Sequence, residues 1–159
     1  MKDASKHNST YPDFLQNQAI CHSTFIHANP MQVYLALTTP QGLDAWFTTG
    51  ASVQAIKGGE INFRWVNWGP DHISTQDGGS VLEAIPGERF VFQWHPDVPD
   101  YPTTVEINLT FKDGGTIVSL REHGFAATPS GLQAMVDCAT GWGEALTLLK
   151  FYLEYGLHY

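Results

Sequence analysis

The clearest repeating pattern of apolar positions lies in the C-terminal part of the chain, between Pro129 and Tyr155. Its apolar members, spaced alternately by three and four residues, are Leu132, Met135, Ala139, Trp142, Leu146, Leu149 and Leu153. This spacing places them on one face of an α-helix. No proline interrupts the segment after Pro129, and Gly156 suits a helix end. At 1.5 Å per residue the helix would run roughly 40 Å, long enough to cross a whole sheet.

Three dipeptides place a capping residue before a proline, which is a typical helix start. They are Asn29-Pro30, Thr39-Pro40 and Thr128-Pro129. A run of strand-forming residues, Ala19 to His27, precedes the first of them. The sequence therefore predicts one strand, two short helices after it, and a long helix that begins at Pro129.

Between Gly50 and Phe125 the pattern changes to short runs of β-branched and aromatic residues. Glycine-containing turn signals separate these runs at residues 57–60, 77–80, 86–88 and 113–116. They predict about six strands. Consecutive strands form a meander, and the last helix is the element able to cover its concave face.

The hairpin around residues 113–116 predicts which strand face is buried. A two-residue loop at Gly114-Gly115 would pair Phe111 with Val118, Leu109 with Leu120, and Ile107 with Glu122. The opposite face would then be polar, with Thr110 opposite Ser119, Asn108 opposite Arg121, and Glu106 opposite His123. A slip of one residue would turn the apolar set to water, so this face is the inner one.

Together these elements predict an α+β fold. We expect a curved antiparallel sheet of about six to seven strands wrapped around the C-terminal helix, with two short helices after the first strand. A single domain should cover residues 19–159, preceded by a flexible tail of residues 1–18.

Composition and charge narrow the classes of function. The 159 residues are 43% hydrophobic and 15% charged, with a net charge of -8 and basic residues that are scattered. This balance argues against nucleic acid and anionic membrane surfaces. No apolar run has the length of a membrane helix, and the polar first eighteen residues lack the apolar stretch of a secretory signal. We therefore expect no membrane insertion and a cytoplasmic protein with reduced Cys21 and Cys138.

The aromatic residues suggest a cavity. Alternation along two strands places Phe90, Phe92 and Trp94 on one face and Ile61, Phe63 and Trp65 on another. These rings either pack against each other or line a ligand cavity between sheet and helix. On the second interpretation the lining residues are Trp46, Phe63, Trp65, Phe92, Trp94, Met135, Trp142 and Leu146.

Glu122 is a carboxylate on the predicted inner face. It is either a strand-end residue that reaches water or a backbone donor, or a polar anchor in the cavity. In the second case Glu122→Gln should change ligand affinity far more than stability. Gly141 and Gly143 flank Trp142, and each costs about 1 kcal/mol in a helix. We favour close approach of the helix to the sheet as the reason, over a helix bend at a cavity mouth.

Motifs for other chemistry are absent from the sequence. There is no HxH, HExxH or Cys/His spacing for a metal, and no GxSxG, P-loop or GxGxxG motif. We therefore expect neither a metal nor a cofactor, and no catalytic residue. An enzyme in the same cavity would need Glu122 or His95 as its general acid or base. Alternation predicts that His95 faces away from Trp94, and the facing of Glu83 stays open.

The order of elements and several motifs resemble the START-like (SRPBCC, helix-grip) superfamily, and within it the family named after the activator of the heat-shock-protein-90 ATPase. The matching motifs are Phe25-Ile26-x-Ala28-x-Pro30-x-x-Val33-Tyr34-x-Ala36-Leu37-Thr38-x-Pro40, Gly79-x-Val81-x-Glu83-x-x-Pro86, Phe92-x-Trp94, Gly115-Thr116-x-Val118-x-Leu120-x-Glu122-x-Gly124-Phe125 and Gly141-Trp142-x-x-x-Leu146-x-x-Leu149-Lys150. The stretch from Trp65 to His72 matches no family motif.

This resemblance implies the helix-grip fold and a small hydrophobic ligand, lipid-like or aromatic, in a monomer or homodimer. Polyketide cyclases share the fold, so an enzyme of the cyclase or hydrolase kind is the first alternative. The family's name adds the stress response and, as a second alternative, interaction with a chaperone ATPase.

Overall fold

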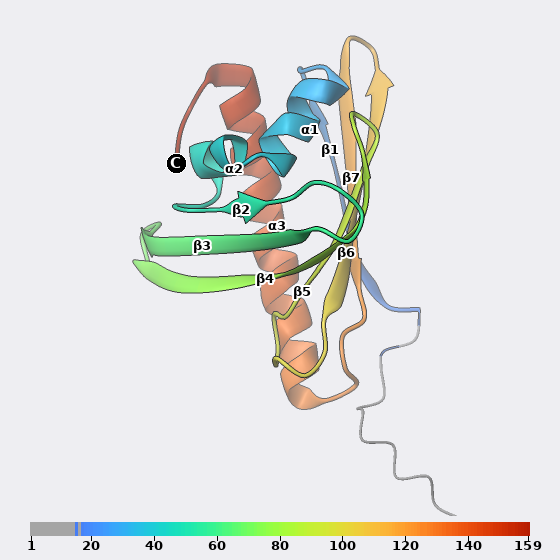
Figure 1. Ribbon diagram of the computed structural model, residues 1–159, viewed down its shortest axis with the longest axis vertical. Coiled ribbons are helices and arrows are strands. Elements are labelled where there is room, and N and C mark those ends of the chain that lie inside the picture. The colour runs from blue at the N-terminus through green and yellow to red at the C-terminus, as the bar shows by residue number, and fades with distance from the viewer. Residues whose placement is uncertain (1–14, 16) are drawn as a thin grey trace, which may run out of the picture.

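The computed structural model describes residue 15 and residues 17–159, and Figure 1 shows its arrangement. In chain order the elements are β1 (Ala19–Ile26), α1 (Pro30–Thr38), α2 (Pro40–Trp46), β2 (Ser52–Val53), β3 (Glu60–Trp68), β4 (Ile73–Ile85), β5 (Arg89–Trp94), β6 (Thr103–Lys112), β7 (Gly115–His123) and α3 (Pro129–Tyr155). The seven strands form one antiparallel sheet in the order β1-β7-β6-β5-β4-β3-β2. The predicted α+β helix-grip fold is confirmed.

The predicted tail lies mostly outside the described residues, which omit residues 1–14 and 16. Leu15 is described, and its backbone N–H donates to the carbonyl of Phe125 at 3.0 Å.

The helix boundaries follow from local capping. Asn29, Thr39 and Thr128 each accept a hydrogen bond from a backbone N–H three residues later, and a proline follows each cap. Gly156 ends α3 with a φ of 67°, in the left-handed region that glycine adopts readily. All three predicted helix starts and the predicted end of α3 are confirmed.

A pair of glycines lies inside β4, where both neighbouring strands come close to the backbone. A Cβ on Gly78 would lie 2.2 Å from the carbonyl oxygen of Ile61, and one on Gly79 would lie 2.2 Å from that of Gln93. Glycine is required there because both neighbouring strands approach the backbone closely. The prediction of a turn at residues 77–80 is therefore wrong, and the chain turns between β3 and β4 instead. In Figure 1, β3 and the first half of β4 pass across α3, while β6 and β7 run alongside it.

The β6–β7 hairpin has a different loop from the predicted one. Lys112 pairs with Gly115, so the loop residues are Asp113 and Gly114, with φ values of 48° and 79°. Positive φ at both positions is typical of a type I′ turn. Gly115 lies in β7, where a Cβ would stand 2.5 Å from the carbonyl oxygen of Ile26 in β1.

This correction shifts every pair by two residues without changing the faces. Leu109 pairs with Val118, and Val105 takes the predicted place of Ile107 opposite Glu122. Because side chains alternate with period two, a shift of two keeps the apolar set inside.

The core lies between the sheet and the three helices. Trp142, Leu146 and Leu149 of the predicted α3 stripe are buried, whereas Leu132 is 47% exposed. At the level of the backbone, α3 packs against β1, α1 and α2 rather than against β3 and β4. Space for a site therefore remains on the β3–β4 side of α3. No helix in the described part of the chain is long and apolar enough to cross a membrane.

Candidate functional site

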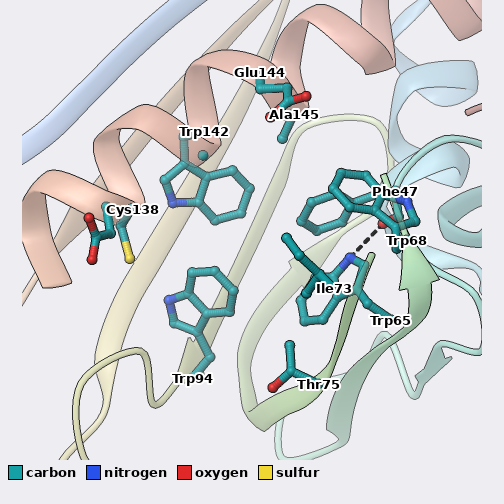
Figure 2. A pocket seen from close by; sticks show the side chains of 12 residues that line it. Phe47, Trp65, Trp68, Ile73, Thr75, Trp94, Cys138, Trp142, Glu144 and Ala145 are labelled. Atoms are coloured by element: carbon teal, nitrogen blue, oxygen red, sulfur yellow. Dashed lines mark hydrogen bonds between the residues drawn. The ribbon is translucent and has the colours of Figure 1, made fainter. Parts of the chain in front are cut away.

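An apolar cleft of about 310 Å³ lies between α3 and the β3–β4 hairpin. Figure 2 shows its lining. The lining residues are Phe47, Trp65, Trp68, Ile73, Thr75, Trp94, Asp137, Cys138, Gly141, Trp142, Glu144 and Ala145. A hollow of this size with aromatic walls is typical of a small-molecule site.

Two groups of aromatic rings face each other across this cleft. Trp94 from β5 and Trp142 from α3 lie side by side, with ring centroids 5.4 Å apart, and Phe47, Trp65 and Trp68 lie across from them (Figure 2). The two groups come within 6.2 Å of each other where Phe47 stacks on Trp142. The Trp65 indole N–H donates to the carbonyl of Phe47 at 2.6 Å, which fixes Trp65 relative to Phe47.

Glu122 on β7 holds the Trp94 and Trp142 rings in place. It is fully buried, and its Oε1 accepts from Trp94 Nε1 at 2.7 Å and from the Thr103 hydroxyl at 2.6 Å. Its Oε2 accepts from Trp142 Nε1 at 2.6 Å. Burial raises the pKa of Glu122, and the three hydrogen bonds act in the opposite direction.

These contacts decide between the two interpretations of Glu122 only in part. A strand-end carboxylate that reaches water or a backbone donor is wrong, because the side chain is buried and its partners are side chains. Glu122 is not among the residues that line the cleft, so its role toward a ligand stays a hypothesis.

The other predicted cavity residues lie in two environments. Trp65, Trp94 and Trp142 line the cleft. Trp46, Phe63 and Phe92 surround a void of only about 10 Å³, which is about one water-sized probe, so these rings pack against each other. Leu146 is buried and Met135 is partly buried against the core, and neither is among the lining residues.

Several residues that line the cleft lie outside the predicted cavity set. Phe47 follows the last residue of α2, and Trp68 lies in the stretch from Trp65 to His72 that no motif explained. Cys138, Gly141 and Ala145 are spaced by three and four residues, which makes a second line beside the predicted α3 stripe. That second line was a usable signal, whereas the position of Phe47 depends on the tertiary fold.

The two glycines of α3 require a correction. A Cβ on Gly141 would meet nothing within 4 Å, and one on Gly143 would lie 3.7 Å from His22 Cε1, an ordinary contact. Close approach of the helix to the sheet is therefore the wrong explanation. Gly141 lines the cleft instead and leaves its α3 wall open.

A second hollow, of about 560 Å³, shares Trp65, Thr75 and Trp94 with the cleft. Asp77 and His95 line it. Burial raises the pKa of Asp77, although its carboxylate accepts the backbone N–H groups of His95 and Gly78. His95 follows the last residue of β5 and lines this hollow together with Trp94, and the prediction that it faces away from Trp94 stays a prediction.

Other reactive groups are accounted for by their surroundings. Burial raises the pKa of the Cys138 thiol, which opposes formation of a thiolate. Glu83, whose facing was open, forms an ion pair with Arg89 Nε at 2.7 Å. Trp68 Nε1 is buried without a partner among the described residues, so water or a ligand is left to satisfy this donor. No cluster of three or more metal-ligating His, Cys, Asp or Glu side chains occurs within the described part of the chain.

Residues 27–154 match the sequence model of the family described as Activator of Hsp90 ATPase homolog 1-like protein. No curated protein matches the chain significantly.

Among solved structures, the Aha1 dimer from Colwellia psychrerythraea is 28% identical, with a TM-score of 0.73 over 87% of this chain and 98% of that one. A Rhodobacter sphaeroides protein is also 28% identical, with a TM-score of 0.69 over 85% of this chain and 91% of that one. CalU16 from Micromonospora echinospora shares the fold at 20% identity, with a TM-score of 0.67 over 87% of this chain and 77% of that one.

Proposed function

This chain belongs to the family of Activator of Hsp90 ATPase homolog 1-like proteins, and from that premise we propose that it binds a hydrophobic small molecule, aromatic or lipid-like, between its sheet and α3. The observation that carries the proposal is the cleft of about 310 Å³ with aromatic walls. Burial of apolar surface is worth about 25 cal/mol per Å², so a flat apolar ligand would gain from leaving water.

The walls are organised before a ligand arrives. Glu122 holds the indole rings of Trp94 and Trp142, and the Phe47 carbonyl holds the ring of Trp65. A preorganised site loses less side-chain entropy on binding, which favours affinity. We infer that Glu122 acts on a ligand through the two indole rings rather than by direct contact.

The cleft favours binding over catalysis. Both oxygens of Glu122 are engaged by three donors, and burial opposes ionisation of Cys138. The cavity-enzyme alternative predicts turnover of a ligand that is lost on Glu122→Gln. The chaperone-associated alternative draws on the family's name, whereas the cleft is a feature of this chain itself.

Native mass spectrometry of the purified protein tests the proposal. We expect an added mass from a retained small molecule, which is lost in Gly141→Leu because the new side chain enters the cleft. Gly143→Ala is the matched control and should keep the added mass, since Gly143 does not line the cleft. An added mass that persists in Gly141→Leu would place the ligand elsewhere and contradict the proposal.

The chain's location and assembly are proposals as well. We expect a cytoplasmic protein that is a monomer or a homodimer, and the Colwellia psychrerythraea protein, described as a dimer, is a precedent for the second state. Sedimentation equilibrium of the full chain distinguishes the two.

A further inference from the structure

Carboxylates line both hollows, and His95 is the basic side chain that lines the second one, 4.0 Å from Asp77. Asp137 and Glu144 of α3 line the cleft, and Asp77 lines the hollow beside it. Within the described part of the chain no lysine or arginine lines either hollow. A molecule bound in the cleft therefore meets the carboxylates of Asp137 and Glu144 at its polar edge.

The aromatic walls favour the same sign of charge. The faces of Trp, Tyr and Phe rings attract cations, and Trp does so most strongly. The cleft is lined by Trp65, Trp68, Trp94 and Trp142, together with Phe47 (Figure 2). A positive group in a hollow of this size lies near several ring faces at once, where water is displaced and the attraction is stronger.

The buried carboxylate of Glu122 strengthens this effect. It accepts the indole N–H groups of Trp94 and Trp142, and hydrogen-bonded groups polarise one another. Donation of each N–H toward Glu122 shifts electron density toward the ring, and this makes the ring face more attractive to a cation. Glu122 thus adds negative potential behind the wall that the ligand contacts.

We propose that the ligand of this cleft is cationic, an apolar or aromatic molecule that carries an ammonium or quaternary ammonium group. The inference rests on the proposed binding function and names the ligand class for the same site. The apolar body would lie in the cleft against its aromatic lining, and the positive group would lie over indole faces near Asp137 and Glu144. A molecule of the same shape with a negative charge would be repelled.

Three water-soluble naphthalene derivatives test the charge preference on the full chain by isothermal titration calorimetry. They are 1-naphthalenemethylamine, which is protonated at neutral pH, the neutral 1-naphthalenemethanol, and the anionic 1-naphthoate. We expect the amine to bind about 2- to 30-fold more tightly than the alcohol, from cation–π attraction. The naphthoate should bind most weakly.

The double variant Asp137→Asn/Glu144→Gln should reduce the ratio of the affinity for the amine to the affinity for the alcohol. Glu60→Gln/Glu88→Gln is the matched control, because it removes the same net charge from exposed positions outside both hollows. Equal reduction in both variants would mean that the overall charge of -8, not the cleft, sets the preference.

The outcomes separate the two proposals. If the alcohol binds and the amine binds no more tightly, the charge preference is wrong while the binding function stands. If the naphthoate binds most tightly, the charge preference is likewise overturned. If none of the three binds, the cleft itself is not a ligand site and both proposals fail.

Discussion

Substitutions at Gly141 should raise the stability of the protein, and a large side chain there should lower its affinity for a ligand. It lies in the middle of α3, where glycine is less favourable than alanine by about 0.5–1 kcal/mol. A Cβ at this position would meet nothing within 4 Å. Gly141→Ala should therefore stabilise the protein by about that amount, which corresponds to a rise in Tm of about 1–4 °C for a chain of this size.

Gly141→Leu should keep most of this gain, because leucine is also a good helix former. Its isobutyl group would enter the cleft and contact the aromatic lining. We expect the affinity for 1-naphthalenemethanol to fall by about tenfold or more, which corresponds to at least 1.4 kcal/mol of binding free energy. Urea unfolding followed by far-UV circular dichroism measures the stability, and calorimetry measures the affinity.

Gly143→Ala provides the comparison. It should stabilise α3 as Gly141→Ala does, since its Cβ would make only an ordinary contact with His22 Cε1 at 3.7 Å. It should leave the affinity unchanged, because Gly143 does not line the cleft. A loss of stability in Gly141→Ala, or an unchanged affinity in Gly141→Leu, would refute the reasoning that Gly141 holds the cleft open.

Three further predictions concern the groups that support the site and the sheet. Thr103→Val removes a hydrogen bond to a buried carboxylate and should lower the free energy of unfolding in urea by about 1.5–3 kcal/mol. Thr116→Val removes a hydrogen bond to a backbone carbonyl and should lower it by only about 0.5–1.5 kcal/mol. Equal losses would contradict the charge-assisted bond. The hydrogen bond from Arg89 holds the pKa of Glu106 below its ordinary value of 4.5, and hydrogen bonds from Arg121 and His123 act in the same direction. The stability difference between wild type and Glu106→Gln should therefore be full above pH 4.5 and vanish as pH falls through the lower folded-state pKa, and a difference that grows in acid would be the wrong sign. Gly79→Ala would bring a Cβ within 2.2 Å of a backbone oxygen and should destabilise the fold by about 3 kcal/mol or more, and a variant as stable as wild type would disprove the close approach of β5 to β4.

The helix boundaries were predictable because their causes are local. The Asn29 side chain accepts the N–H of Gln32, and the Gln32 side-chain oxygen accepts the N–H of Asn29, all within four residues. The causes at the two ends of α3 are also local, because the Thr128 hydroxyl accepts the N–H of Gly131 and Gly156 adopts a positive φ.

Glycine turns were less predictable because glycine serves two purposes. Gly114 is needed for its positive φ, which a short sequence pattern suggests. Gly115 and Gly79 are needed because a backbone from another strand lies within 2.5 Å of where a Cβ would be. Only the neighbouring strand distinguishes the two cases, so the local pattern gave the wrong loop and one false turn.

The candidate site shows the same division. Strand alternation and the helical stripe predicted that Trp94, Trp142 and Glu122 face the interior. In the structure both indole N–H groups donate to Glu122. Trp68 was missed because it lies on β3, and β3 crosses α3 only in the folded sheet (Figure 1). Phe47 was missed because it follows α2 and reaches the cleft only through the tertiary fold. Periodicity alone cannot report it.

The central claim is that an apolar ligand occupies the cleft between α3 and the β3–β4 hairpin. The most direct test follows the five indole N–H signals by NMR while 1-naphthalenemethanol is added. We expect the signals of Trp65, Trp68, Trp94 and Trp142 to shift, because these rings line the cleft. The signal of Trp46 should stay in place, since its N–H donates to the Ala36 carbonyl in the core. Five unmoved signals, or a shift of Trp46 alone, would contradict the account.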